Sequence, residues 1–126
     1  MNKNNSTIRS LGICLGASTI SAVMLKDEAG RISIEKTRVT AHEGNPRAIF
    51  ERLIQEWATP QVKVLITGRK FRQFVRLPSI TEPEAIEIAL SFIVKKGKHY
   101  DALVSAGGET FMVYRLDHQH RITGIS

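Results

Sequence analysis

The chain has 126 residues but only one cysteine, Cys14, so no disulfide can form within it. It also has no apolar run that approaches the ~18 residues of a membrane-spanning helix. The polar residues 2–6 are not followed by the apolar segment of a secretory signal peptide. A lone thiol, no signal peptide and no membrane span lead us to expect a soluble protein of the cytoplasm.

Familiar catalytic signatures are missing as well. The sequence contains no P-loop, no dinucleotide-binding fingerprint and no Ser/His/Asp constellation. The histidines His42, His99, His118 and His120 do not have the spacing of a metal site, and the pair at 118 and 120 falls on an expected turn. We therefore expect no metal site built from these side chains, and the sequence identifies no catalytic residue.

The formal net charge is +6, and part of it lies in a basic stretch over residues 69–76. Phe71 and Phe74 stand between Arg69, Lys70, Arg72 and Arg76, a composition that can stack on and neutralise nucleic acid. No recognition helix or RNA-binding signature accompanies it, so nucleic acid is the disfavoured alternative. We expect the two phenylalanines to anchor a surface loop whose arginines face solvent or a partner.

The sequence does contain one pattern that occurs twice, a strand followed by a glycine bend. Residues 11–19 (LGICLGAST) and 103–110 (LVSAGGET) are both apolar strands that break at glycine and offer hydroxyl or acidic side chains at the bend. A second alternating strand and a polar turn follow each bend, and lead to an Arg-Ile pair at 31–32 and at 121–122. The repeat predicts a duplicated domain whose two hairpins face one ligand, for which phosphate is the natural candidate.

The order of the expected elements indicates an α/β fold. A strand pattern covers residues 11–15, 20–25 and 31–39, and Asn45-Pro46 opens a helix with an apolar stripe that ends at Trp57. A strand at 62–66 ended by Gly68, a helix capped by Thr81 and Glu84, and a strand at 102–106 complete the series. The apolar face of the second helix is predicted to be Ile86, Ala89, Leu90 and Ile93.

This series, β-β-β-α-β-α-β followed by the opening hairpin of a second copy, is ribonuclease H-like. We expect residues 1–7 to be disordered or tag-like and residues 8–101 to form the first ribonuclease H-like lobe. Residues 102–126 would supply the first hairpin and the start of the third strand of a truncated second lobe. The chain is thus expected to be a piece of a larger protein.

The two bends supply the predicted binding residues. Glycine lets backbone N–H groups approach phosphate oxygens closely, and hydroxyl side chains add donors without charge. One such turn also serves an ordinary hairpin, so the second copy is what favours a binding role. The predicted phosphate-facing residues are Gly16, Ala17, Ser18, Thr19, Gly107, Gly108, Glu109 and Thr110.

The chain resembles the N-terminal part of the 2-hydroxyacyl-CoA dehydratase activators, the BadF/BadG/BcrA/BcrD-type ATPase family of CoA-enzyme activases. Residues 11–25 are similar to that family's first phosphate motif and residues 104–116 to its second, and the segments 65–69 and 80–89 agree too. The family belongs to the superfamily of acetate and sugar kinases and actin. The resemblance therefore implies an actin-like ATPase that binds ATP or ADP with Mg²⁺ between two lobes.

The resemblance also implies partners. Members act on a 2-hydroxyacyl-CoA dehydratase-type enzyme, form homodimers and hold a 4Fe-4S cluster with cysteines of two subunits. Those cysteines would lie beyond this chain, in the remainder of a larger activase.

Three positions depart from the family pattern. Cys14 and Ser105 stand where the family has the aspartates that position metal and water, and Ser21 replaces a lysine. Magnesium prefers hard oxygen ligands, so a thiol is a poor substitute, and Glu109 is the one carboxylate left in the second bend. We expect Cys14 to be a small buried hydrophobe of a central strand. The sequence predicts a nucleotide-binding domain with little or no hydrolysis, or alternatively a non-catalytic scaffold or docking domain.

Overall fold

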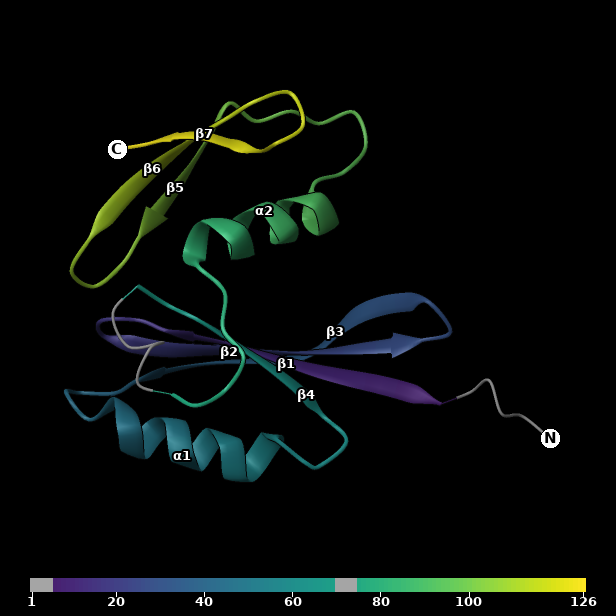
Figure 1. Ribbon diagram of the computed structural model, residues 1–126, viewed down its shortest axis with the longest axis vertical. Coiled ribbons are helices and arrows are strands. Elements are labelled where there is room, and N and C mark those ends of the chain that lie inside the picture. The colour runs from purple at the N-terminus through teal and green to yellow at the C-terminus, as the bar shows by residue number, and fades with distance from the viewer. Residues whose placement is uncertain (1–5, 70–74) are drawn as a thin grey trace.

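The computed structural model describes residues 6–69 and 75–126, and within them two sheets with one helix each form two stacked halves (Figure 1). The strands are β1 (Thr7–Leu15), β2 (Thr19–Glu28), β3 (Arg31–Ala41), β4 (Lys63–Thr67), β5 (Ala102–Ala106), β6 (Phe111–Leu116) and β7 (Ile122–Ile125). The helices are α1 (Pro46–Trp57) and α2 (Glu82–Ile93). The predicted order is confirmed, whereas the predicted anchors Phe71 and Phe74, with Lys70 and Arg72, lie outside the described residues.

The first sheet has the order β3-β2-β1-β4, with an antiparallel meander and β4 parallel to β1. Strand alternation puts the odd-numbered apolar residues of β1 and the even-numbered ones of β2 on one face, which α1 covers. Leu53 and Trp57 of α1 pack there and are 3% and 6% exposed. The core on this face also contains Leu11, Ile13, Leu15, Ile20, Ala22, Met24 and Ile66.

Helix α1 begins where the sequence predicts. The side chain of Asn45 accepts a hydrogen bond from the Ala48 amide at 3.4 Å, and Pro46 occupies the first turn. Both features satisfy the free end of a helix, because proline lacks the N–H that would otherwise have no partner there.

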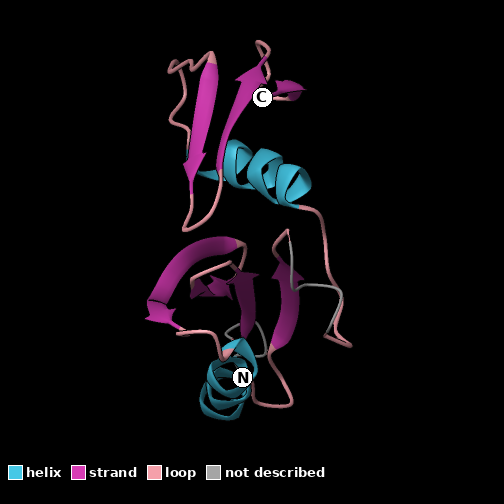
Figure 2. Ribbon diagram, turned by 90° about the vertical axis from the view of Figure 1, so that its left-hand side faces the viewer, coloured by secondary structure: helices cyan, strands magenta, loops and turns pink. Residues whose placement is uncertain are grey.

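The second sheet, β5-β6-β7, is antiparallel throughout, and α2 lies beside it (Figure 2). Tyr114 of β6 is 1% exposed, and the side chain of Glu87 on α2 accepts a hydrogen bond from the Ile122 amide at 2.8 Å. Beyond β4, at the edge of the first sheet, the described residues form an isolated parallel bridge between Ile66 and Ser79. The lobe boundary after residue 101 stays a prediction, since α2 makes hydrogen bonds both to the second sheet and to Arg69 of the first half.

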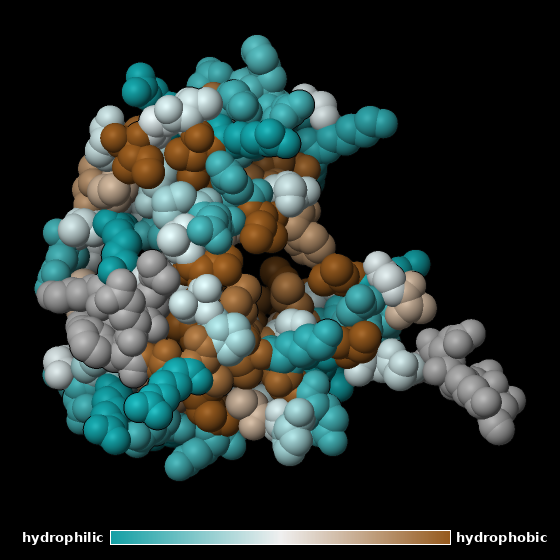
Figure 3. Space-filling view, in the orientation of Figure 1, coloured by the Kyte–Doolittle hydropathy of each residue, from teal (hydrophilic) through white to brown (hydrophobic). Residues whose placement is uncertain are grey.

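Only part of the predicted apolar face of α2 is covered. Leu90 is 5% exposed, but Ile93 is 63% exposed. Ile88 and Phe92 on the same helix are exposed as well. Apolar side chains gather along the hollow between the two halves (Figure 3). Periodicity identified the helix, but it could not say which side a neighbour would cover.

The two helices that the structure describes have 12 residues each, which is too short to cross a lipid bilayer.

Candidate functional site

The two bends are the same turn built twice. In the first, the Gly16 amide donates to the Thr19 carbonyl at 2.9 Å, and in the second the Gly107 amide donates to the Thr110 carbonyl at 2.8 Å. The flanking strand pairs also correspond, Leu15 with Ile20 and Ala106 with Phe111. A Cβ atom on Gly16 would stand 2.8 Å from the Thr19 carbonyl oxygen, so this turn requires glycine there.

The bends meet at one cavity, on the same side of the two halves (Figure 1). A Cβ atom on Gly108 would lie 1.8 Å from Ser18 Oγ, so the second bend rests directly on the first. The cavity has a volume of about 270 Å³, and all eight predicted phosphate-facing residues line it. It is lined further by Cys14, Leu15, Ser21, Gly68, Arg69, Glu82, Ser105 and Ala106. That these residues bind phosphate stays a prediction.

Unused backbone donors lie at this cavity. The amides of Ala17, Ser18 and Gly108 donate no hydrogen bond to any residue that the structure describes. Successive free N–H groups in a glycine bend form a concavity that favours an anion. The arrangement can therefore hold a phosphate or carboxylate with main-chain donors from both hairpins.

His42 supports the first bend from behind, a role that sequence reasoning missed. It is 5% exposed, and its Nε2 lies 3.1 Å from the Gly16 carbonyl oxygen while its Nδ1 accepts from the Gly44 amide at 3.2 Å. Since Nδ1 accepts, Nε2 carries the proton and donates to Gly16. The His42 amide also donates to the Ser18 carbonyl at 3.0 Å. No motif marks this histidine, because Gly16 and Ser18, the bend residues that it supports, are distant in the sequence.

Gly68 brings the end of β4 to the same place. Its φ of +135° is a conformation that side chains rarely adopt, and a Cβ atom there would stand 2.4 Å from the Leu15 carbonyl oxygen. The next residue, Arg69, therefore lies at the cavity. The buried hydroxyl of Thr67, which pairs with Cys14 in the sheet, has no hydrogen-bond partner among the described residues.

Arg69 is the centre of a polar network that joins the halves. Its guanidinium donates to Glu82 in the first turn of α2 and to the Thr110 hydroxyl in the second bend. Its Nη2 is 3.4 Å from Ser105 Oγ, and Ser105 Oγ donates in turn to Glu82 Oε1 at 3.0 Å. The Glu82 side chain is 15% exposed. Sequence reasoning assigned Glu82 only to a helix start and missed that its carboxylate enters the site.

The pKa values of Arg69, Cys14 and Tyr114 are all raised above their ordinary values around this network. The hydrogen bond to Glu82 raises the pKa of Arg69 and keeps it charged. Burial raises the pKa of the Cys14 thiol, the negative charge of Glu82 raises it further, and Arg69 lowers it. Burial also raises the pKa of Tyr114, and Glu82 adds to that shift. The charges of Glu82 and Arg69 thus both affect the pKa values of Cys14 and Tyr114.

Cys14 is not the fully buried hydrophobe that we expected. It does lie in an interior strand, β1, but it is only half-buried and faces the cavity. Strand alternation explains the difference, because its neighbours Ile13 and Leu15 belong to the core under α1 and leave Cys14 on the opposite face of the sheet.

The residues present do not suit the Mg²⁺ ion that the family resemblance implies. A thiol at 14 and a hydroxyl at 105 stand where the resemblance would place carboxylates, and the Glu82 carboxylate is already bound by Arg69. No group of three or more His, Cys, Asp or Glu among the described residues could hold a metal ion. His99 does lie near His118 and His120, with ring centroids 5.9 Å and 5.2 Å apart, which their sequence positions did not reveal.

Comparisons with known proteins identify the fold. No protein-family model matches the sequence, and no curated protein matches it. Among solved structures, the activator of the 2-hydroxyisocaproyl-CoA dehydratase from Clostridium difficile, solved with bound ADPNP, superposes with a TM-score of 0.71 at 18% identity. The match covers 94% of this chain and 44% of that one.

Two phosphatase-type structures are also similar. An exopolyphosphatase from Cytophaga hutchinsonii has a TM-score of 0.62 at 16% identity, covering 94% of this chain and 49% of its own. The PPX-GPPA enzyme of Aquifex aeolicus has a TM-score of 0.57 at 13% identity, covering 96% and 52%. The chain spans about half the length of these structures. The chain shares the ribonuclease H-like fold of these structures.

Proposed function

We propose that this chain is a nucleotide-binding domain of the dehydratase-activator type, in which the two hairpin bends hold the phosphates of ATP or ADP. The observation that carries the proposal is the single cavity lined by both bends, with unused amides at Ala17, Ser18 and Gly108. The dehydratase activator that superposes on the chain was solved with an ATP analogue, which supports a nucleotide as the ligand.

The proposal includes little or no hydrolysis by these residues. Phosphoryl transfer needs charge stabilisation and a positioned water, which carboxylate-held metal commonly supplies. Cys14 and Ser105 offer neither at the positions where the family has aspartates. A 4Fe-4S cluster is not proposed for these residues, since Cys14 is the one cysteine in the sequence.

Calorimetric titration with ATP and with ADP, followed by a phosphate-release assay, tests this function. We expect micromolar binding of both nucleotides without steady turnover. Absence of binding would refute the nucleotide site, and steady ATP turnover that Gly16→Asp abolishes would refute the inactivity. The wider context of a larger activase chain, a homodimer, a dehydratase-type partner enzyme and a cytoplasmic location belongs to the same proposal.

A scaffold or docking role is the second candidate, and one observation favours it. The bends rest on each other through the Ser18–Gly108 contact, and Arg69 ties the second bend to the end of β4 through its bond to Thr110. A domain that binds no nucleotide but keeps this arrangement would be a rigid module for a partner. Failure of both nucleotides to bind, with the fold intact, is the result that this alternative predicts.

A further inference from the structure

Arg69 connects three parts of the cavity wall: the end of β4, α2 and the second hairpin. It belongs to the first half, at the end of β4, yet it donates to Glu82 on α2 and to Thr110 in the second bend. Its side chain is 33% exposed, so a ligand in the cavity can reach it. One guanidinium, with five donors in a planar fork, thus contacts both α2 and the second hairpin at the cavity.

The charge of the cavity depends on this residue. Among the described residues that line it, Arg69 is the one cation, and Glu82 and Glu109 are the anions. A phosphate held by the bend amides would need a positive partner, and arginine matches phosphate oxygens with two parallel hydrogen bonds. The partner is present, but in this structure its charge faces Glu82.

The position of Glu82 favours its negative charge, so it can compete with a phosphate for Arg69. It lies in the first turn of α2, where the helix dipole favours a negative charge, and its Oε1 accepts from Ser105 Oγ at 3.0 Å. The resemblance places metal-binding aspartates at Cys14 and Ser105. Ser105 hydrogen-bonds to Arg69, and the charges of Arg69 and Glu82 both shift the pKa of Cys14. The guanidinium is therefore the positive charge at the place where the family would have a metal.

We propose that Arg69 is the phosphate-binding cation of this site in place of a divalent metal, and that Glu82 competes with the phosphate for it. The proposal rests on the proposed function, because both concern the same cavity. Without ligand, Arg69 pairs with Glu82. A bound phosphate takes over guanidinium hydrogen bonds, and Glu82 keeps the hydroxyl of Ser105.

The two partners of one ion pair are then expected to affect binding in opposite directions. Glu82→Gln keeps the size of the side chain and removes its charge, so Arg69 is freed and ATP binds about tenfold more tightly. Arg69→Gln removes the cation and weakens ATP binding about tenfold or more, as expected for a hydrogen bond to a charged group. A purely structural pair would lower the affinity in both variants.

The metal requirement is measured in the same experiment. ATP is titrated calorimetrically into the wild-type chain with excess MgCl₂ and with EDTA. We expect the two dissociation constants to agree within about threefold, because arginine supplies the charge. A loss of about tenfold or more in EDTA would overturn the proposal.

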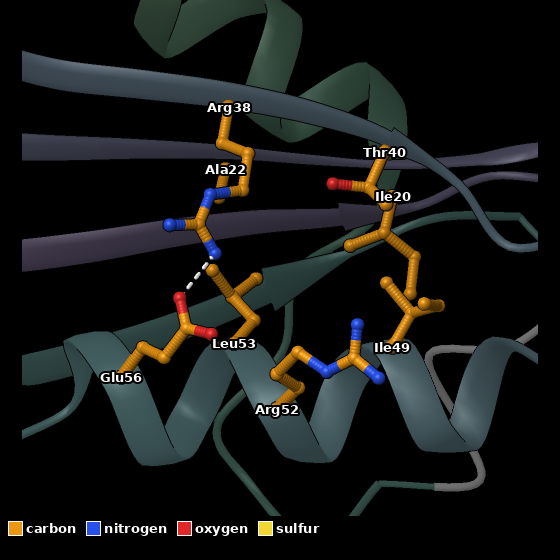
Figure 4. A pocket seen from close by; sticks show the side chains of 8 residues that line it. All are labelled: Ile20, Ala22, Arg38, Thr40, Ile49, Arg52, Leu53 and Glu56. Carbon is orange, nitrogen blue, oxygen red and sulfur yellow. Dashed lines mark hydrogen bonds and ion pairs between the residues drawn. The ribbon is translucent and has the colours of Figure 1, made fainter.

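Another cross-element ion pair provides the matched control. Arg38 of β3 bonds to Glu56 of α1, with Nη1 and Oε2 2.6 Å apart, beside a separate pocket under the first sheet (Figure 4). Arg38→Gln and Glu56→Gln remove the same chemical groups from residues that do not line the cavity of the bends, and they should leave ATP binding unchanged. Circular dichroism verifies that each variant folds, and Arg69→Lys, which keeps the charge but not the fork, should bind ATP more weakly than wild type and more tightly than Arg69→Gln.

The outcomes separate the two proposals. Tighter binding by Glu82→Gln, weaker binding by Arg69→Gln and indifference to EDTA support the role of Arg69. Binding that needs Mg²⁺, or that Glu82→Gln weakens, overturns this role and leaves nucleotide binding in place. If neither the wild type nor Glu82→Gln binds ATP in either buffer, both proposals are wrong.

Discussion

Gly108 rests against the side chain of Ser18, so the two hairpins touch at the positions predicted to hold one ligand. A Cβ atom on Gly108 would stand 1.8 Å from Ser18 Oγ and 2.6 Å from Ser18 Cβ. Nothing larger than glycine fits there while the bends keep their present distance.

Gly108→Ala should therefore push the bends apart, with a loss of about 1–3 kcal/mol in the free energy of unfolding, typical of an overpacked contact. Ser18→Gly in the same chain removes the clashing atoms and should restore most of that loss. Urea unfolding of the two single variants and the double variant measures this coupling. Gly107→Ala is the control, because its Cβ atom would meet only the Thr110 carbonyl oxygen, at 3.4 Å. Additive effects of the two substitutions would contradict the contact.

Gly68→Ala should destabilise the first half by about 3 kcal/mol or more. The substitution forces alanine into a positive φ and places its Cβ atom 2.4 Å from the backbone of Leu15, where no side-chain motion can relieve it. Fluorescence of Trp57, the one tryptophan of the chain, reports the unfolding. Gly12→Ala lies in the neighbouring strand with no atom within 4 Å of its Cβ and should change the stability little. Equal stability of the two variants would disprove the strain at Gly68.

His42→Ala should loosen the first bend. It removes the Nε2 donor to the Gly16 carbonyl and the Nδ1 acceptor of the Gly44 amide, and the loss of each hydrogen bond costs about 0.5–1.5 kcal/mol. We expect a lower free energy of unfolding and weaker ATP binding, measured by urea unfolding and calorimetry. His42→Gln, which keeps a donor, should recover part of both. Unchanged ATP affinity in the alanine variant would show that the bend does not need this support.

The alkylation of Cys14 should depend on pH in a way that reports its two charged neighbours. Because burial and Glu82 raise the pKa of the thiol, the thiolate forms only at higher pH than in an ordinary cysteine, and reaction with iodoacetamide at neutral pH is slow. Glu82→Gln removes a raising charge and should shift the rate profile to lower pH. Arg69→Gln removes a lowering charge and should shift it to higher pH. If both variants shifted the rate profile in the same direction, Glu82 and Arg69 would not both act on the Cys14 thiol as described.

The repeated elements of this fold were predictable, because strands, helix starts and glycine bends leave local signals. Asn45 and Thr81 mark the helix starts that the structure has, and the two glycine bends were recognised as copies before their contact was known. Those signals depend on neighbouring residues alone, which is why they can be read from one sequence.

The parts that escaped prediction depend on contacts between distant segments. The sequence marks Thr81 and Glu84 as the helix cap and Arg69 as part of a basic loop, but it gives Glu82 no separate role, although Glu82 pairs with Arg69 at the cavity. His42 carries no motif, and its bond to Gly16 links the segment after β3 to the bend between β1 and β2. The exposure of Ile93 likewise follows from what packs on α2, which periodicity does not state.

The central claim is that the two bends form one anion site, and amide chemical shifts during an ATP titration test it most directly. In ¹⁵N-labelled protein, we expect the amides of Ala17 and Ser18 and the amide of Gly108 to shift together, with one common dissociation constant. Shifts confined to one hairpin, or different constants for the two, would contradict a shared site.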